Sequence, residues 1–228
     1  MHAADLALAR LLRLASPMLP VGGFSYSQGL EAAIEHGWVK DEATALAWIG
    51  DVLSLSMGAF EAPIWCRLYA AWASGDVGAA CSWNEFFSAA RETAELHAET
   101  RQMGYSMRAL LVDCGEFEAS RLEALRAVSQ PALPTVFSFA CAAWGIPRRE
   151  ALLAYVWAWL ENQVSAALRT VPLGQTAGQR VLARLSERLP EVVDAALEAE
   201  DDDLSNCAPG LAIASSRHET QYTRLFRS

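Results

Sequence analysis

Apolar residues recur along the chain at intervals of three and four positions, which is the spacing of amphipathic α-helices. The strongest pattern follows Pro147, where Leu152, Val156 and Trp159 share one face of a helix predicted to end at Pro172. No run of alternating β-branched residues between hairpin turns is present, so strands are not indicated. The pattern therefore predicts an all-α protein.

Residues that favour helix ends divide the chain into further predicted helices. These helices cover 5–15, 25–37, 41–52 and beyond, 82–111, 136–144 and 176–188. Asp41 is a suitable N-cap, and Ser25 and Ser82 each precede Gln or Glu by three positions, as in a capping box. Gly58 and Pro63 are expected to break or kink the helix that begins at Asp41.

The resulting architecture is a single helical domain with a separate end. We predict a bundle-like domain of about eight to ten helices over residues 1–203, and a C-terminal partner-binding tail over 204–228. The acidic run EAEDDD at 198–203 is expected to be a solvated connector between them.

Composition limits the function classes. Hydrophobic residues make up 53% of the 228 residues, enough for a sizeable core. The net charge of −9 argues against nucleic-acid binding, which normally uses a basic surface. Lys40 is the only lysine, and the many arginines suit protein–protein ion pairs or reflect a bias in composition.

The apolar stretch from Val52 to Trp72 is interrupted by Glu61, Pro63 and Arg67, and it is not read as a membrane span. The N-terminus lacks the pattern of a signal peptide. The five cysteines are widely spaced, without a CxxC pair, which favours free thiols in a reducing compartment. We expect a cytoplasmic protein.

No enzyme motif is complete. Ser25 lies in GGFSYSQG, but Ser27 occupies the position of the second glycine of a nucleophile elbow, and no strand precedes it. A small helical hydrolase that uses Ser25 remains the alternative of a different class. The segment PLGQTAGQR lacks the lysine of a phosphate loop, so no nucleotide site is predicted there.

Candidate ligands and acid–base groups are scattered. His218 with Cys207 could form a weak metal site, because imidazole suits nickel or zinc, so a direct metal carrier is a further alternative. Glu95 and Glu99, with Glu92 and Arg101, lie in one predicted helix, where a solvated face is a more usual explanation than an acid–base pair. We assign no catalytic residue, cofactor or resident metal.

The chain end is unusual because it carries aromatic and apolar bulk. Its last residues, HETQYTRLFRS, interleave Tyr222, Leu225 and Phe226 with arginines. Aromatic residues and arginines anchor protein interfaces, so a tail that becomes ordered on a partner is predicted. Docking of the tail onto its own domain is the alternative.

Four strings carry a family resemblance. They are LLRLASPMLPVGGFSYSQGLE at 11–31, ETRQMG at 99–104, NQVSAALRTVPLGQTAGQ at 162–179 and HETQYTRLFRS at 218–228. Together and in this order, they resemble the UreF family of urease accessory proteins. The resemblance implies an all-α homodimer without catalytic activity of its own. It also implies association with UreD (UreH in some systems) and with the GTPase UreG, for nickel delivery to apo-urease.

The resulting hypothesis assigns two contact surfaces to a helical platform. The tail would bind UreD through His218, Glu219, Gln221, Tyr222, Arg224, Leu225, Phe226 and Arg227. The loop with Pro17, Pro20, Ser25 and Tyr26 would contribute another contact surface, for which UreG is the candidate. Whether an arginine of this chain acts on the GTPase stays open.

Overall fold

The computed structural model describes residues 3–228 and contains helices but no strand in that range. The α-helices are α1 Ala3–Ala15, α2 Leu30–Glu35, α3 Glu42–Val52, α4 Ala62–Ser74, α5 Val77–Ala89, α6 Ala94–Cys114, α7 Ala119–Ala127, α8 Leu133–Ala143, α9 Arg148–Thr170, α10 Gln175–Ser186, α11 Leu189–Glu198 and α12 Pro209–His218. Short 3₁₀ turns cover Gly23–Ser25 and Asp201–Asp203, and a π-helical segment covers Leu53–Glu61. The all-α prediction is confirmed.

The helix that begins at Asp41 is not broken at Gly58 or Pro63. Asp41 caps α3 as predicted, and α3 continues through the π-helical segment into α4. Pro63 lies in the first turn of α4 and cannot bond the carbonyl four residues earlier. That carbonyl, of Ala59, accepts a hydrogen bond from the Ser205 backbone N–H at 3.1 Å instead. A distant segment therefore satisfies the group that the proline leaves free.

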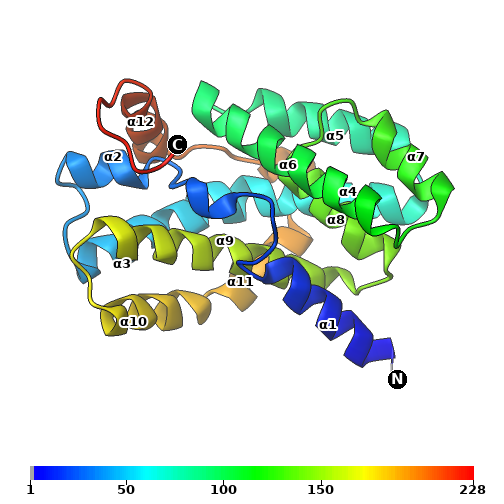
Figure 1. Ribbon diagram of the computed structural model, residues 1–228, viewed down its shortest axis with the longest axis horizontal. Helices are drawn as coiled ribbons and strands as arrows, with labels where there is room; N and C mark the ends of the chain where they lie inside the picture. Colours follow the sequence, from blue (N-terminus) through cyan, green and yellow to red (C-terminus); the bar gives the residue numbers. More distant parts are fainter. Residues whose placement is uncertain (1–2) are drawn as a thin grey trace.

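This long helix runs through the middle of the fold (Figure 1). The α4 part packs against α5, α8, α9 and α11, and α8 in turn packs against α6. The helix α9 contacts α1, α10 and α11. By length and composition alone, the segment Glu42–Ser74 could cross a membrane. Its packing against four neighbouring helices is that of a core helix.

Gly104 determines how closely α6 approaches the segment before α8. A Cβ atom at this position would lie 2.0 Å from the Pro131 carbonyl oxygen and 2.7 Å from the Ala132 carbonyl carbon. Real Cβ atoms do not come this close to backbone, so only glycine fits. The close approach fixes the position of α6, whose N-terminal half carries Glu95 and Glu99.

Several predicted helix starts are wrong. Gly29, with φ of 75°, precedes α2, so Ser25 and Gln28 do not form a capping box. The predicted 82–111 helix is two helices, because Thr93 caps α6 anew. Three helices, α7, α11 and α12, were not predicted. The acidic run contains the exposed 3₁₀ turn Asp201–Asp203.

Candidate partner-binding site

The last helix of the structure, α12, packs on α2 and brings His218 into a buried cluster of charges. The His218 Nδ1 atom lies 2.6 Å from Glu95 Oε2, and its Nε2 atom lies 3.1 Å from Glu31 Oε2. Ionised carboxylates only accept hydrogen bonds, so both contacts form when both ring nitrogens carry a proton. Three helix ends meet here, since Glu31 and Glu95 lie in first turns and His218 in a last turn. The helix dipole favours negative carboxylates in a first turn and a positively charged histidine in a last turn.

The same two glutamates hold the chain after α12. Glu31 Oε1 accepts a hydrogen bond from the Leu225 backbone N–H at 2.7 Å, and Oε2 accepts one from Phe226 at 2.9 Å. The Arg224 guanidinium donates to Glu95 Oε1 at 2.6 Å. The two carboxylates therefore fix both the end of α12 and the segment that follows it.

The end of the chain is buried against its own domain. Phe226 is only 4% exposed, and the Arg169 guanidinium lies 4.3 Å from its ring centroid. The Ser228 carbonyl oxygen accepts from the Ser27 backbone N–H at 2.8 Å, and the Ser228 hydroxyl donates to Glu99 Oε2 at 2.7 Å. In this structure the tail is thus docked on its own chain, which is the alternative that the sequence left open.

The tail and the loop after α1 are in direct contact. The Arg227 backbone N–H donates to the Ser25 carbonyl oxygen at 2.8 Å. Arg169 joins the two segments further, because its guanidinium also donates to the Phe24 carbonyl oxygen at 2.6 Å. The sequence analysis assigned the two segments to separate contact surfaces. In the fold they form one continuous surface, made of the loop 17–26 and the tail 218–228, which we call the tail–loop surface.

The predicted contact residues divide by exposure. Pro17, Pro20, Glu219, Tyr222, Arg224, Leu225 and Arg227 are exposed, Ser25 and Gln221 are partly exposed, and Tyr26, His218 and Phe226 are buried. Tyr222 is fully exposed and Leu225 is 56% exposed, which leaves both side chains free to meet another molecule. Phe226 and His218 instead fix the tail in place. Burial also raises the pKa of the Tyr26 hydroxyl.

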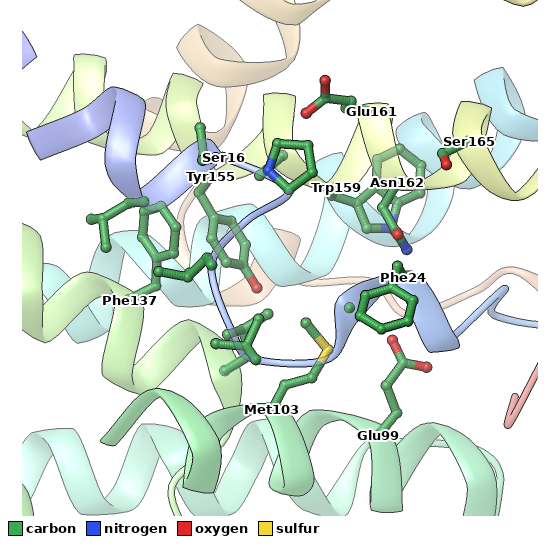
Figure 2. Close-up of a pocket in the computed structure, with 18 of the residues that line it drawn as sticks. Ser16, Phe24, Glu99, Met103, Phe137, Tyr155, Trp159, Glu161, Asn162 and Ser165 are labelled. Atoms are coloured by element: carbon green, nitrogen blue, oxygen red, sulfur yellow. The ribbon is translucent and has the colours of Figure 1, made fainter. Parts of the chain in front are cut away.

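A cavity of about 240 Å³ lies beneath the tail–loop surface. Figure 2 shows Tyr155, Trp159 and Asn162 lining it from α9, and Glu99 and Met103 lining it from α6 on the opposite side. The loop after α1 passes between these helices and adds further apolar lining.

Two carboxylates lie at the inner wall of the cavity. Glu61 pairs with Arg91 at 3.4 Å and accepts a hydrogen bond from the Tyr155 hydroxyl. Glu99 is only 5% exposed and accepts from neutral donors, Gln28 Nε2 at 2.7 Å and the Ser228 hydroxyl. Burial raises the pKa of Glu99 to about 7. It also raises the pKa of the Tyr155 hydroxyl, which faces Glu61.

Sequence reasoning missed the carboxylates that organise this region. The helix pattern favours a solvated face for Glu95 and Glu99, but their spacing of four places both on the side of α6 that meets the tail. Their partners, His218 and Ser228, lie more than 120 positions away. One signal was available, since Glu31 and Glu99 lie at the ends of two of the four strings that carry the resemblance.

The alternatives gain no support from the geometry. Within residues 3–228, no histidine or carboxylate is hydrogen-bonded to the Ser25 hydroxyl, so no hydrolase dyad is assembled around it. Cys207 is exposed, whereas both ring nitrogens of His218 face glutamates in the interior. The described part of the chain also holds no group of three or more His, Cys, Asp or Glu residues that is placed for a metal ion.

Comparison with known proteins agrees with the four strings. A family model described as UreF matches residues 39–186. A urease accessory protein UreF from Azoarcus sp. (strain BH72) is 58% identical over 98% of this chain and 96% of that protein. The chain belongs to the UreF family.

Other UreF-family relatives match at similar levels. The urease accessory protein UreF of Methylobacillus flagellatus is 51% identical over 97% of this chain and 98% of its own length. A bifunctional urease accessory protein UreEF from Bordetella bronchiseptica is 53% identical over 97% of this chain, which spans 52% of that longer protein. These relatives are named as accessory proteins and not as enzymes.

Proposed function

We propose that this UreF-family protein is a non-catalytic scaffold that joins UreD and UreG during nickel insertion into apo-urease. The observation that carries the proposal is the tail–loop surface, where a rigidly held chain end presents Tyr222 and Leu225 to solvent. Aromatic side chains on a pre-ordered backbone bind with little loss of conformational entropy. The surface continues over Pro17 and Pro20, so one face can meet two partners side by side.

The named relatives support a role within the urease system. The Bordetella relative carries UreF-like sequence in a protein named as the bifunctional UreEF, which suits a chain that works beside other accessory proteins. A homodimer in the cytoplasm and an effect on GTP turnover by UreG belong to the same proposal. Sedimentation of the purified chain and GTP turnover by UreG, with and without this protein, test these two points.

Co-purification with UreD tests the surface itself. Deleting residues 218–228 is a poor test, because it would also remove the contacts of His218 with Glu31 and Glu95 that hold the end of α12, so a loss of UreD would not be specific to the exposed surface. The double substitution Tyr222→Ala and Leu225→Ala removes exposed groups only. We expect it to abolish recovery of UreD without changing helix content.

The matched control is Leu55→Ala, which removes a side chain that is 47% exposed on the π-helical segment. This variant should bind UreD as the unsubstituted protein does. Unchanged recovery of UreD by the double variant would reject the tail–loop surface as its docking site. A serine hydrolase activity in the pure protein, lost in Ser25→Ala, would reject the non-catalytic assignment.

A further inference from the structure

The cavity beneath the tail–loop surface is too small for a drug-sized ligand but has the volume to hold one side chain. Pockets for drug-sized ligands measure about 300 to 1,000 Å³, whereas this one measures about 240 Å³. Its walls are largely apolar, with Met103, Phe137 and Trp159 among the lining residues. Such walls suit the methylene stem of a long side chain whose polar head lies at the bottom.

The charges at the inner wall do not balance. Glu61 is paired with Arg91, but no Arg, Lys or His among residues 3–228 forms an ion pair with Glu99. The group formed by Glu61, Arg91 and Glu99 therefore carries one negative charge without a counter-ion when Glu99 is ionised. Glu161 also lines the cavity, but it is partly exposed and lies on the side opposite Glu99 in Figure 2. Carboxylates in a low-dielectric hollow attract a cation strongly.

The residues around the cavity resemble the rim of a protein interface. Phe24 lines the cavity and is 63% exposed, and Met18, between the lining residues Pro17 and Leu19, is 89% exposed. Exposed apolar residues around a pocket exclude water from a central anchor when a partner docks. Arginine is a preferred anchor, because its guanidinium pairs with carboxylates and is more weakly hydrated than an ammonium group.

We propose that the cavity receives one arginine side chain of a partner protein, with the guanidinium at Glu99 and the stem between α6 and α9. This inference rests on the proposed scaffold function and names the chemistry by which one partner is recognised. The proposed site is connected to the tail, because Glu99 also accepts a hydrogen bond from the Ser228 hydroxyl.

The test uses the full chain and a capped arginine, N-acetyl-arginine amide, with the capped citrulline amide as an uncharged probe of the same shape. The Trp159 indole N–H donates to Gln28 Oε1 at 2.8 Å, and Gln28 in turn bonds Glu99, so NMR signals of both side chains report on the cavity. We expect the arginine probe to shift these signals and the citrulline probe to leave them unchanged. Equal shifts from both probes, or none from the arginine probe, would overturn the proposal.

Two variants separate the site from the fold. Glu99→Gln should weaken binding of the arginine probe at least tenfold. Ala158→Leu fills the cavity from α9 without changing any residue that bonds the tail, and it should also block the probe. Undiminished binding by a folded Ala158→Leu variant would place the probe elsewhere. Binding of methylguanidinium as tight as that of capped arginine would indicate a site for free small cations and contradict the proposal.

The partner is tested with the complex captured through UreD. Ala158→Leu should weaken that complex. If the Tyr222→Ala and Leu225→Ala substitutions break the complex while Ala158→Leu does not, a partner arginine does not occupy the cavity, although the scaffold function stands. If no variant affects capture, the proposed tail–loop surface fails, whatever the arginine probe shows.

Discussion

Replacing Glu99 by glutamine should stabilise the protein increasingly as the pH rises from 5 to 8. Glu99 is buried and its pKa is raised from 4.5 to about 7, chiefly because burial disfavours the ionised form. In the unfolded chain, the carboxyl group has its ordinary pKa. Between about 4.5 and 7, the folded protein therefore holds a proton that the unfolded chain has released. By linkage, the free energy of unfolding falls as the pH rises through this window and changes little above it.

The magnitude follows from the two pKa values. At about 1.4 kcal/mol per pH unit, the full difference corresponds to about 3 kcal/mol, of which about 2 to 3 kcal/mol is lost between pH 5 and pH 8. Glutamine cannot ionise and escapes this loss. Its amide keeps one oxygen for the Gln28 donor but requires the Ser228 hydroxyl to accept, which costs about 1 kcal/mol at every pH.

Urea unfolding followed by tryptophan fluorescence measures the effect at pH 5, 6, 7 and 8. The difference in unfolding free energy between Glu99→Gln and the unsubstituted protein should move in favour of glutamine by about 2 to 3 kcal/mol over this range. Glu92→Gln, at an exposed carboxylate, is the control and should show a nearly constant difference. A constant difference for Glu99→Gln as well would refute the account of Glu99 as a buried, uncompensated acid.

Three further substitutions test the packing by the same unfolding assay. Gly104→Ala should destabilise by about 3 kcal/mol or more, because its Cβ would lie 2.0 Å from the Pro131 carbonyl oxygen. Gly174→Ala is the control and should change stability little, because a Cβ there has no atom within 4 Å. His218→Ala should destabilise by about 3 kcal/mol, because it removes a fully buried ring that contacts two largely buried carboxylates and leaves Glu95 with Arg224 as its remaining partner. Asn84→Ala should cost about 2 kcal/mol, because Asn84 Oδ1 accepts buried hydrogen bonds at the start of α8. Losses below about 0.5 kcal/mol at any of these three sites would contradict the packing described.

Local sequence patterns predicted the helices that depend on local signals. The α9 helix follows from its apolar periodicity, and Asp41 caps α3 as its position indicates. The start of α5 shows the limit of such patterns. Ser82 and Glu85 have capping-box spacing, but Asp76 already accepts from the Ala79 backbone N–H, so Ser82 lies inside the helix and bonds the Gly78 carbonyl. Asp76 and Ser82 are both suitable N-caps within one short segment, and residue spacing alone does not show which of them begins the helix.

The candidate site was predictable in outline but not in its chemistry. The sequence identified the tail and the loop as unusual segments, yet it could not show that they touch, because the Arg227–Ser25 bond joins opposite ends of the chain. The sequence also could not show that Glu99 accepts a hydrogen bond from Ser228, which lies 129 positions later in the chain. A charged residue on a helix is normally solvated, and only tertiary structure reveals that a distant segment covers it.

Partner binding can be weakened in two ways that can be measured separately. One is to loosen the tail, and the other is to remove an exposed contact residue from it. Phe226 is the one buried apolar side chain after α12, and the remaining anchors are polar groups that fix a single geometry. Phe226→Ala should therefore loosen residues 219–228, raise their amide hydrogen exchange and weaken UreD binding by adding an ordering cost. Tyr222→Ala should weaken binding without changing exchange, because that side chain is fully exposed. If Phe226→Ala raises exchange but leaves affinity unchanged, pre-ordering of the tail contributes nothing to recognition, and the partner must select its contacts from a mobile chain end.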